Sequence, residues 1–351
     1  MTIDVYDAIA PPAAEWEALA LRTGAPPFAR PGWFAAWWPA FGVGDPLVVT
    51  ATRRGRLTGV LPLRRRAGVL ASPTNAHTPA YGALTEDAAA AGELAGWVFA
   101  QRPRRVQLDH VDAADATLPA LQRAAARSGH RMLRTVVQRS PYAVLVPGED
   151  VDRRLGAKAA GNLRRIRRRL EEAGHVEMRV ETTPARLDRL LEEGFRLESS
   201  GWKAERGTAI RSSPSTLRFY VGLARWASGA GLLRLGFLRL DGHAIAFAFG
   251  LQDRTAFYLL KGGYDPAHRR FAPGKLLFRS LMAGAVASGA QRFELLGAAE
   301  PWKLEWTLHC HERTLVRTYA PTVLGTADRA TQTAYLRYGR PFAKRALTRA
   351  R

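Results

Sequence analysis

The stretch of sequence that decides the fold covers residues 255–306, TAFYLLKGGYDPAHRRFAPGKLLFRSLMAGAVASGAQRFELLGAAEPWKLEW. Its first residues, up to Lys261, are aromatic and aliphatic, and the glycines and proline that follow are typical of a strand end. A helix is expected from Gly274, because apolar residues recur at helical spacing until Gly289. The short apolar run Phe293–Leu296 predicts a second strand. Strand, helix and strand in this order imply two parallel strands joined by a right-handed crossover.

The loop between the first strand and the helix is basic. It contains Arg269, Arg270, Gly274 and Lys275. Backbone N–H groups at a helix start are unpaired and carry the positive end of the helix dipole, so this loop could hold a phosphate group. A solvated basic turn is the alternative, because short glycine–basic matches are frequent by chance.

Several motifs occur in a fixed order along the chain. Within the stretch above these are Y-x-L-K-x-x-Y-D-P, R-F-x-P-G-K-L-L, F-E-L-L-G and E-P-W-K-L-E-W. Upstream lie Ser200-Gly201-Trp202-Lys203, the basic run from Lys158 to Leu170 and an N-terminal P-G-W-F-A-A-W-W. In this order they resemble the GNAT-fold acyltransferases related to the Fem aminoacyl transferases and the CelD-like acetyltransferases. The resemblance covers most of the chain.

The resemblance implies an α/β (α+β) protein with tandem GNAT-like domains, each a mixed central sheet flanked by helices. Residues 1–147 would form a degenerate first domain that completes the acceptor cleft, and residues 148–327 the catalytic domain with a leading basic helix at 152–173. Residues 328–351 are expected as a basic C-terminal helix. The aromatic segment Gly32–Phe41 predicts a short core helix, and Asp241-Gly242 is a strong hairpin signal.

The composition is that of a soluble globular protein, with 47% hydrophobic and 24% charged residues among 351. The single cysteine, Cys310, allows no internal disulfide and favours a reducing compartment. No apolar run approaches bilayer length, so we expect a cytoplasmic protein without a membrane span. His309 and His311 flank Cys310 but lack the spacing of zinc ligands, and no metal site is expected.

The charge is strongly basic: 52 Lys and Arg residues against 31 Asp and Glu give a formal net charge of +21. Such a chain is expected to meet polyanions, although an arginine-rich proteome would give the same excess. The basic residues concentrate on the predicted helix 152–173, at Arg164, Arg165, Arg167, Arg168 and Arg169. These guanidinium groups suit a phosphodiester backbone. A solvated helix packed on the domain edge is the alternative.

No nucleophile motif emerges, which leaves direct attack by an amine on a bound acyl donor. By resemblance, Trp302 would stack on the 3′-terminal adenosine of an aminoacyl-tRNA, and Lys303 would stabilise the developing oxyanion. An ordinary ion pair of Lys303 with Glu300 or Glu305 is the alternative. The candidates to accept a proton or orient the amine are Glu300, Asp265 and Tyr264. Trp202 and Lys203 are expected on the acceptor side by resemblance alone.

These features together predict an amide-forming transferase that moves an aminoacyl group from aminoacyl-tRNA to an amine acceptor, without a bound cofactor. The acceptor would be a cell-wall precursor or a small natural product such as a peptide antibiotic intermediate. The absence of a long helical arm in the second domain favours a small soluble amine. The first alternative is an N-acetyltransferase that uses acetyl-CoA, although R-F-A-P-G-K departs from the usual acyl-CoA loop. The second is a non-catalytic RNA-binding protein.

Overall fold

The structure is a computed structural model that describes residues 1–182, 185–200, 207 and 209–334. Within these residues the chain forms two compact units. Unit 1 comprises residues 1–19, 43–137 and the described part of the chain from Arg313 onward, and unit 2 comprises residues 20–42 and 138–312. The sequence-based division placed each domain in one continuous stretch. In the structure, residues 20–42 instead join unit 2, and most of the last strand, from Arg313 onward, joins unit 1.

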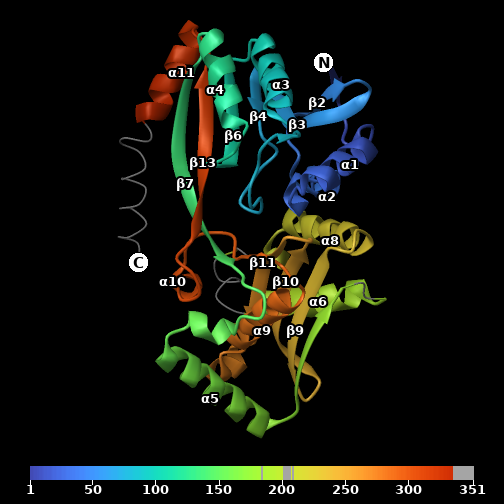
Figure 1. Ribbon diagram of the computed structural model, residues 1–351, viewed down its shortest axis with the longest axis vertical. Coiled ribbons are helices and arrows are strands. Elements are labelled where there is room, and N and C mark those ends of the chain that lie inside the picture. The colour runs from blue at the N-terminus through green and yellow to red at the C-terminus, as the bar shows by residue number, and fades with distance from the viewer. Residues whose placement is uncertain (183–184, 201–206, 208, 335–351) are drawn as a thin grey trace. The chain divides into compact units, whose positions relative to one another are not determined.

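Unit 1 is a mixed sheet with helices packed against it (Figure 1). Its strands follow the order β1-β2-β3-β4-β6-β13-β7, with β5 paired to β3. Strands β4 and β6 run parallel, whereas the pairs β1–β2, β2–β3, β3–β4, β3–β5 and β6–β13 are antiparallel. The elements are β1 (Thr2–Tyr6), α1 (Ala13–Thr23), β2 (Asp45–Arg53), β3 (Arg56–Arg66), β4 (Val69–Ala71), β5 (Leu84–Thr85), α3 (Ala88–Ala100), β6 (Arg105–Asp112), α4 (Leu118–Arg127), the start of β7 (Arg131–Val144), most of β13 (Cys310–Tyr319) and α11 (Val323–Ala334).

Unit 2 has a second mixed sheet, in the order β7-β12-β11-β10-β9-β8, and in its described part only β11 and β12 run parallel. Its elements are α2 (Pro31–Phe41), the end of β7, α5 (Ala157–Ala173), β8 (Val176–Glu181), α6 (Leu187–Glu198), α8 (Pro214–Gly229), β9 (Leu233–Leu240), β10 (His243–Gln252), β11 (Ala256–Tyr264), α9 (Pro273–Ala287), β12 (Arg292–Glu294) and α10 (Pro301–Leu304), with short 3-10 helices η1 (Pro27–Ala29), η2 (Val151–Arg154), η3 (Ile210–Ser212) and η4 (Pro266–Phe271). The predicted α/β class with a mixed, helix-flanked sheet in each half is therefore confirmed.

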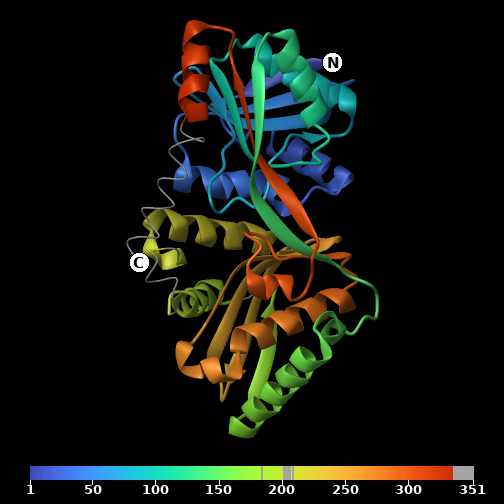
Figure 2. The same ribbon diagram turned by 90° about the vertical axis from the view of Figure 1, so that its left-hand side faces the viewer.

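Helices cover both faces of the unit 2 sheet. On one face α5 and α9 share a core with β9, β10 and β12, to which Leu163, Leu277 and Phe293 contribute (Figure 2). On the other face Phe195 of α6 and Tyr220 of α8 pack against Phe249 of β10. Strands β9 and β10 are thus largely buried on both sides, and ligands of open α/β sheets commonly bind at the strand ends.

The aromatic helix α2 belongs to this second face. Trp33 and Phe41 both pack against Phe219 of α8, with ring centroids 5.2 and 5.4 Å apart. A Cβ atom on Gly32 would lie 1.9 Å from the Trp226 indole nitrogen, so only glycine allows this close approach of the two helices. The predicted core role of the α2 aromatic residues is confirmed, and their packing explains why residues 20–42 join unit 2.

Local turn chemistry fixes the hairpin between β9 and β10. Asp241 and Gly242 both have positive φ, 48° and 80°, as a two-residue turn of this hand requires. The predicted strand–helix–strand unit is also observed: β11 and β12 are parallel and α9 connects them. The second strand ends earlier than predicted, because the backbone after Glu294 turns at Leu296 and Gly297, whose φ values are 53° and 60°.

Candidate active site

The candidate site lies at the carboxyl ends of the parallel strands β11 and β12. The two strands pair only from Ala256 to Tyr258 on β11 and from Arg292 to Glu294 on β12. Beyond this point β12 stops, whereas β11 continues to Tyr264. In open α/β sheets, ligands bind outside the carboxyl ends of parallel strands, where neighbouring connections separate.

A compact loop follows β11 and leads into α9. Asp265 caps the 3-10 helix η4: its Oδ1 accepts a hydrogen bond from Ala267 N at 2.9 Å, and its Oδ2 lies 3.0 Å from His268 Nδ1. Ala272 adopts a left-handed conformation, with φ 43°, and the chain then enters α9 at Pro273. Asp265 is therefore engaged in shaping the loop.

Gly274 lets the Tyr264 ring approach the first turn of α9, because a Cβ atom at this position would lie only 3.2 Å from the ring. Among the described residues no side chain caps the helix start, and its first turn contains no acidic residue. No side chain of α9 itself therefore offsets the positive end of the helix dipole. Arg269 and Arg270 on η4 are exposed, with the Arg270 guanidinium 4.6 Å from the Phe271 ring centroid. The predicted donor loop thus presents cations and a helix start together.

The short helix α10 packs beside this loop. Lys275 Nζ, in the first turn of α9, forms an ion pair with Glu305, the residue after α10. One turn further along α9, Phe278 meets Trp302 edge-on, with ring centroids 5.5 Å apart, and lies 4.9 Å from the Trp306 ring. The basic loop and the Trp302-Lys303 pair, 30 residues apart in the sequence, therefore lie together in unit 2.

Lys303 is buried, with 7% of its surface exposed. Its ammonium donates hydrogen bonds to Leu296 O at 2.7 Å and Ala298 O at 3.0 Å, and lies 3.4 Å from Glu300 Oε2. An ammonium group has three N–H donors, and these three oxygens match that number. In this conformation Lys303 therefore holds the loop after β12. Its predicted role at the oxyanion remains a prediction, and it requires the ammonium to exchange one of these oxygens for the donor carbonyl.

Trp302 is partly exposed, at 41%, and its Nε1 donates a hydrogen bond to Glu300 Oε2 at 3.0 Å. Glu300 thus bridges Trp302 and Lys303. Tyr264 is similarly exposed, at 40%, and lies against Gly274. The structure brings these residues to one end of the sheet, whereas Trp202 and Lys203 lie outside the described residues. Their catalytic and acceptor-binding roles remain predictions.

The basic helix α5 packs against η2 and η4. All five of its clustered arginines are exposed, and three of them have acidic or amide partners: Arg164 with Asp152 at 3.6 Å, Arg165 with Asn162 at 2.8 Å, and Arg167 with Glu171 at 2.8 Å. Asp152 is itself buried and anchors Arg279 of α9, with Nε and Oδ1 2.5 Å apart. Helix α5, which carries these arginines, is also in contact with the η4 segment that carries Arg269 and Arg270.

Sequence reasoning missed a buried carboxylate at the end of β12. Glu294 is 4% exposed, and both of its oxygens lie 3.2 Å from His311 Nε2 on β13. Tyr142 on β7 stacks on the same imidazole, with centroids 4.1 Å apart. The sequence offers a weak signal, a glutamate inside a short apolar strand and a histidine near the start of another strand.

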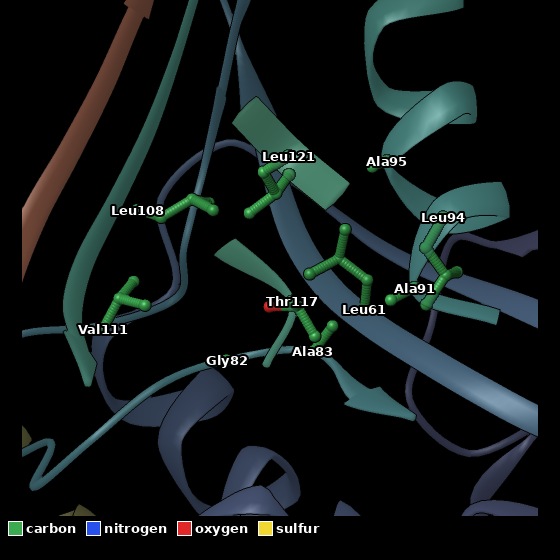
Figure 3. Close-up of a pocket in the computed structure, with 10 residues that line it drawn as sticks. All are labelled: Leu61, Gly82, Ala83, Ala91, Leu94, Ala95, Leu108, Val111, Thr117 and Leu121. Atoms are coloured by element: carbon green, nitrogen blue, oxygen red, sulfur yellow. The ribbon is translucent and has the colours of Figure 1, made fainter. Parts of the chain in front are cut away.

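Unit 1 has a small apolar cavity of about 10 Å³, the space of about one water molecule (Figure 3). Its lining residues are Leu61, Gly82, Ala83, Ala91, Leu94, Ala95, Leu108, Val111, Thr117 and Leu121, and it contains none of the predicted site residues. Across the described ranges there is no group of three or more His, Cys, Asp or Glu residues suited to a metal ion. No described helix combines the length and apolar character that a membrane crossing needs.

Comparisons with known proteins agree with this architecture. Residues 157–304 match the family model of the acetyltransferase (GNAT) domain. FemX aligns with 96% of this chain and 100% of its own, at a TM-score of 0.62 and 12% identity. The C-terminal domain of a putative lysylphosphatidylglycerol synthetase from Agrobacterium fabrum aligns with 93% of this chain and 98% of its own, at a TM-score of 0.56 and 13% identity. L-PGS from Bacillus licheniformis aligns with 91% of this chain and 96% of its own, at a TM-score of 0.56 and 12% identity. A search of curated proteins found no match.

At these identities the solved structures establish a shared fold. The family model covers the segment that contains α5, the donor loop and α10. The resemblance to Fem-like GNAT-fold proteins that the sequence motifs indicated is therefore confirmed.

Proposed function

We propose, from the GNAT domain at residues 157–304 and the Fem-like fold of the chain, that this protein is an acyltransferase that moves an aminoacyl group from aminoacyl-tRNA to a small amine. The observation that carries the proposal is the ion pair between Lys275 and Glu305. It joins the uncapped start of α9 to the segment of Trp302 and Lys303, so an anion-binding helix start and an exposed indole lie at one end of the sheet.

The basic surface favours a nucleic-acid donor over a free nucleotide. Arginines on α5 and on η4 extend well beyond the area that one pyrophosphate group occupies, and α5 packs directly against η4. Many exposed guanidinium groups on two contacting elements suit repeated phosphodiester contacts, each of which releases counterions. Arg269, Arg270, Gly274 and Lys275 would bind the 3′ end of the donor, and Trp302 would stack on its terminal base.

The chemistry requires no covalent intermediate on the protein. The acceptor amine, once it has lost its proton, attacks the acyl carbonyl, and the ester bond to the ribose breaks. The N-terminal turn of α9 and Lys303 are the cationic groups available near the developing negative charge. Lys303 would serve this step only by exchanging one of its present oxygen partners.

Acetyl-CoA is the second candidate donor, because the matched family model is an acetyltransferase domain. The test separates the two. Purified protein is incubated with a mixed amine pool and either total aminoacyl-tRNA or acetyl-CoA, and products are identified by mass spectrometry. Amide products that require aminoacyl-tRNA and disappear after ribonuclease treatment support the proposal. If products form with acetyl-CoA alone, the donor is acetyl-CoA and not aminoacyl-tRNA. If neither donor gives a product, the assignment as an acyltransferase is overturned.

A further inference from the structure

Strand β8 forms one edge of the unit 2 sheet. It pairs with β9 on one side, and no other described strand pairs with its outer side (Figure 1). An open strand edge presents unpaired N–H and C=O groups that can pair with another chain. Devices that protect such edges include proline, bulges and very short strands. None of these occurs in β8, which has six residues, contains no proline and keeps an unbroken register with β9.

The direction of the backbone groups of β8 follows from the residue that precedes it. The carbonyl of His175 accepts a hydrogen bond from Asp241 N at 2.8 Å, and its N–H donates to Asp241 Oδ1 at 2.7 Å. The backbone groups of His175 thus point toward the turn between β9 and β10. Because successive residues of a strand alternate in this direction, Val176, Met178 and Val180 point their N–H and C=O groups toward the open edge.

The side chains of β8 differ between its two faces. The apolar side chains at the three outward-pointing positions lie on the face that α5 and α9 cover, and those of Met178 and Val180 are 37% and 42% exposed. On the other face the charges alternate: Arg179 lies 2.8 Å from Glu177 and 3.9 Å from Glu181. The edge therefore offers exposed apolar groups on one face and a Glu–Arg–Glu row on the other.

This edge is complementary to itself in one register. A second copy of β8 can pair antiparallel with the first where outward-pointing residues face one another. With Met178 opposite Met178 of the second copy, Val176 faces Val180. In the same register Glu177 of each copy faces Arg179 of the other. A shift of two residues would place Glu177 opposite Glu177 or Arg179 opposite Arg179, and like charges directly opposite are destabilising.

We propose that β8 is a self-association edge, at which a second copy of this chain adds its own β8 antiparallel, centred on Met178. Each pair of outward-pointing residues would exchange two backbone hydrogen bonds, and the two unit 2 sheets would become one continuous sheet. The contact is isologous and uses the single β8 edge of each copy, so association stops at a dimer. No residue of β8 belongs to the candidate active site, so this dimer would form whether or not the proposed function holds.

Reciprocal charge reversal tests the register. Glu177→Arg alone, or Arg179→Glu alone, places like charges at both cross-strand contacts, so the dimer Kd of each variant should rise about tenfold or more. An equimolar mixture of the two variants restores opposite charges at both contacts and should form a heterodimer with a Kd near wild type. Sedimentation velocity over a range of concentrations measures all of these. Val5→Arg is the matched control, at a similarly exposed position of the edge strand β1, and should leave the Kd unchanged.

A crosslink provides a readout that does not depend on the charge variants. Met178→Cys, combined with Cys310→Ser, leaves one cysteine in each copy, at the two-fold axis. The Cα atoms of such opposed strand residues lie about 5.5 Å apart, within the span of a disulfide, so mild oxidation should link the dimer. Val5→Cys in the same background is the control.

A wild-type chain that stays monomeric up to about 100 μM would overturn the proposal. So would folded charge variants, checked by their melting curves, that dimerise as tightly as wild type, because the interface would then lie elsewhere. If the charge variants do not fold, the crosslink decides: no more linked dimer from Met178→Cys than from Val5→Cys would overturn the proposal as well.

Discussion

Lys275 in the first turn of α9 is paired with Glu305, the residue that follows α10. This ion pair joins the two segments that the sequence motifs single out, the basic loop after β11 and the tryptophan–lysine pair. Both side chains remain partly exposed, at 32% and 44%, so the pairing leaves the Lys275 ammonium accessible to an anionic ligand. An exposed pair of this kind contributes little to stability, typically no more than about 1 kcal/mol.

We expect Lys275→Met to weaken donor binding far more than it weakens the fold. The donor KM should rise about tenfold or more, because the variant has no ammonium to donate a charge-assisted hydrogen bond to phosphate. The free energy of unfolding should fall by less than about 1 kcal/mol. Glu305→Gln is the matched control, since it breaks the same ion pair but keeps the cation, and its donor KM should stay near wild type. An equal rise of the donor KM in both variants would show that donor binding depends on the ion pair and not on the Lys275 cation itself.

Lys303 should be a strong determinant of stability. Lys303→Met removes the ammonium that bonds Leu296 O and Ala298 O and leaves two carbonyls without this donor. Leu296 is buried, and an unsatisfied buried acceptor costs about 1–3 kcal/mol, whereas Ala298 is exposed and its carbonyl can bond to water. Urea unfolding should therefore show a loss of roughly 1–3 kcal/mol. Lys303→Arg keeps a cation at the site and should lose less. Unchanged stability in Lys303→Met would mean that its ammonium is available for catalysis without a structural penalty.

The arginine face of α5 should determine the salt dependence of RNA binding. Arg168→Glu with Arg169→Glu should reduce the slope of log K against log salt by about 0.9 for each phosphate that the variant no longer neutralises. The control is Arg123→Glu with Arg127→Glu on α4, which makes the same charge change at exposed positions of unit 1. Fluorescence anisotropy with labelled tRNA at several salt concentrations measures both. Equal effects of the two double substitutions would indicate that net charge alone drives binding.

The attachment of α6 to its sheet should weaken in acid. Arg239 on β9 donates two hydrogen bonds to Glu193 on α6, at 2.7 and 2.8 Å, and this interaction holds the pKa of Glu193 below its ordinary value. A lowered carboxyl pKa contributes stability that is complete above about pH 4.5 and is lost as pH falls through the folded pKa. Glu193→Gln should therefore flatten the pH dependence of the melting temperature below about pH 4.5. An unchanged acid slope would contradict this assignment.

Much of the fold could be predicted from local sequence. The hairpin at Asp241-Gly242 follows from turn chemistry, and α9 begins at Pro273, one residue before the predicted start. The predicted end of β12 lies two residues too far along the chain. The backbone turns at Leu296 and Gly297, and Lys303, which donates to Leu296 O, comes later in the sequence and gives no local signal there. Helix α2 could be predicted as an aromatic core helix, but its partner Phe219 lies far along the chain. The spacing of apolar residues shows which face of a helix is buried, but it does not show which other element packs against that face.

The candidate site was predictable only in part. Motif order predicted that the basic loop and the Trp302-Lys303 pair converge on one donor pocket, and the packing of Phe278 against Trp302 shows that the two segments are neighbours. Their shared role in donor binding stays a prediction. The bonds of Lys303 to backbone carbonyls have no signature in the sequence. His311 was weighed only as a zinc ligand beside Cys310, because its partner Glu294 lies on another strand and nothing in the spacing links the two.

Hydrogen–deuterium exchange of the full chain with and without a non-hydrolysable aminoacyl-tRNA analogue tests the central claim most directly. A donor that is bound between the basic loop and α10 should protect peptides that cover residues 264–275 and 296–305 together, with weaker protection over 157–173. Desulfo-CoA in a parallel sample should protect the first two segments without the third if acetyl-CoA is the donor. Binding that leaves residues 264–275 and 296–305 unprotected, or no binding of either ligand, would contradict the account.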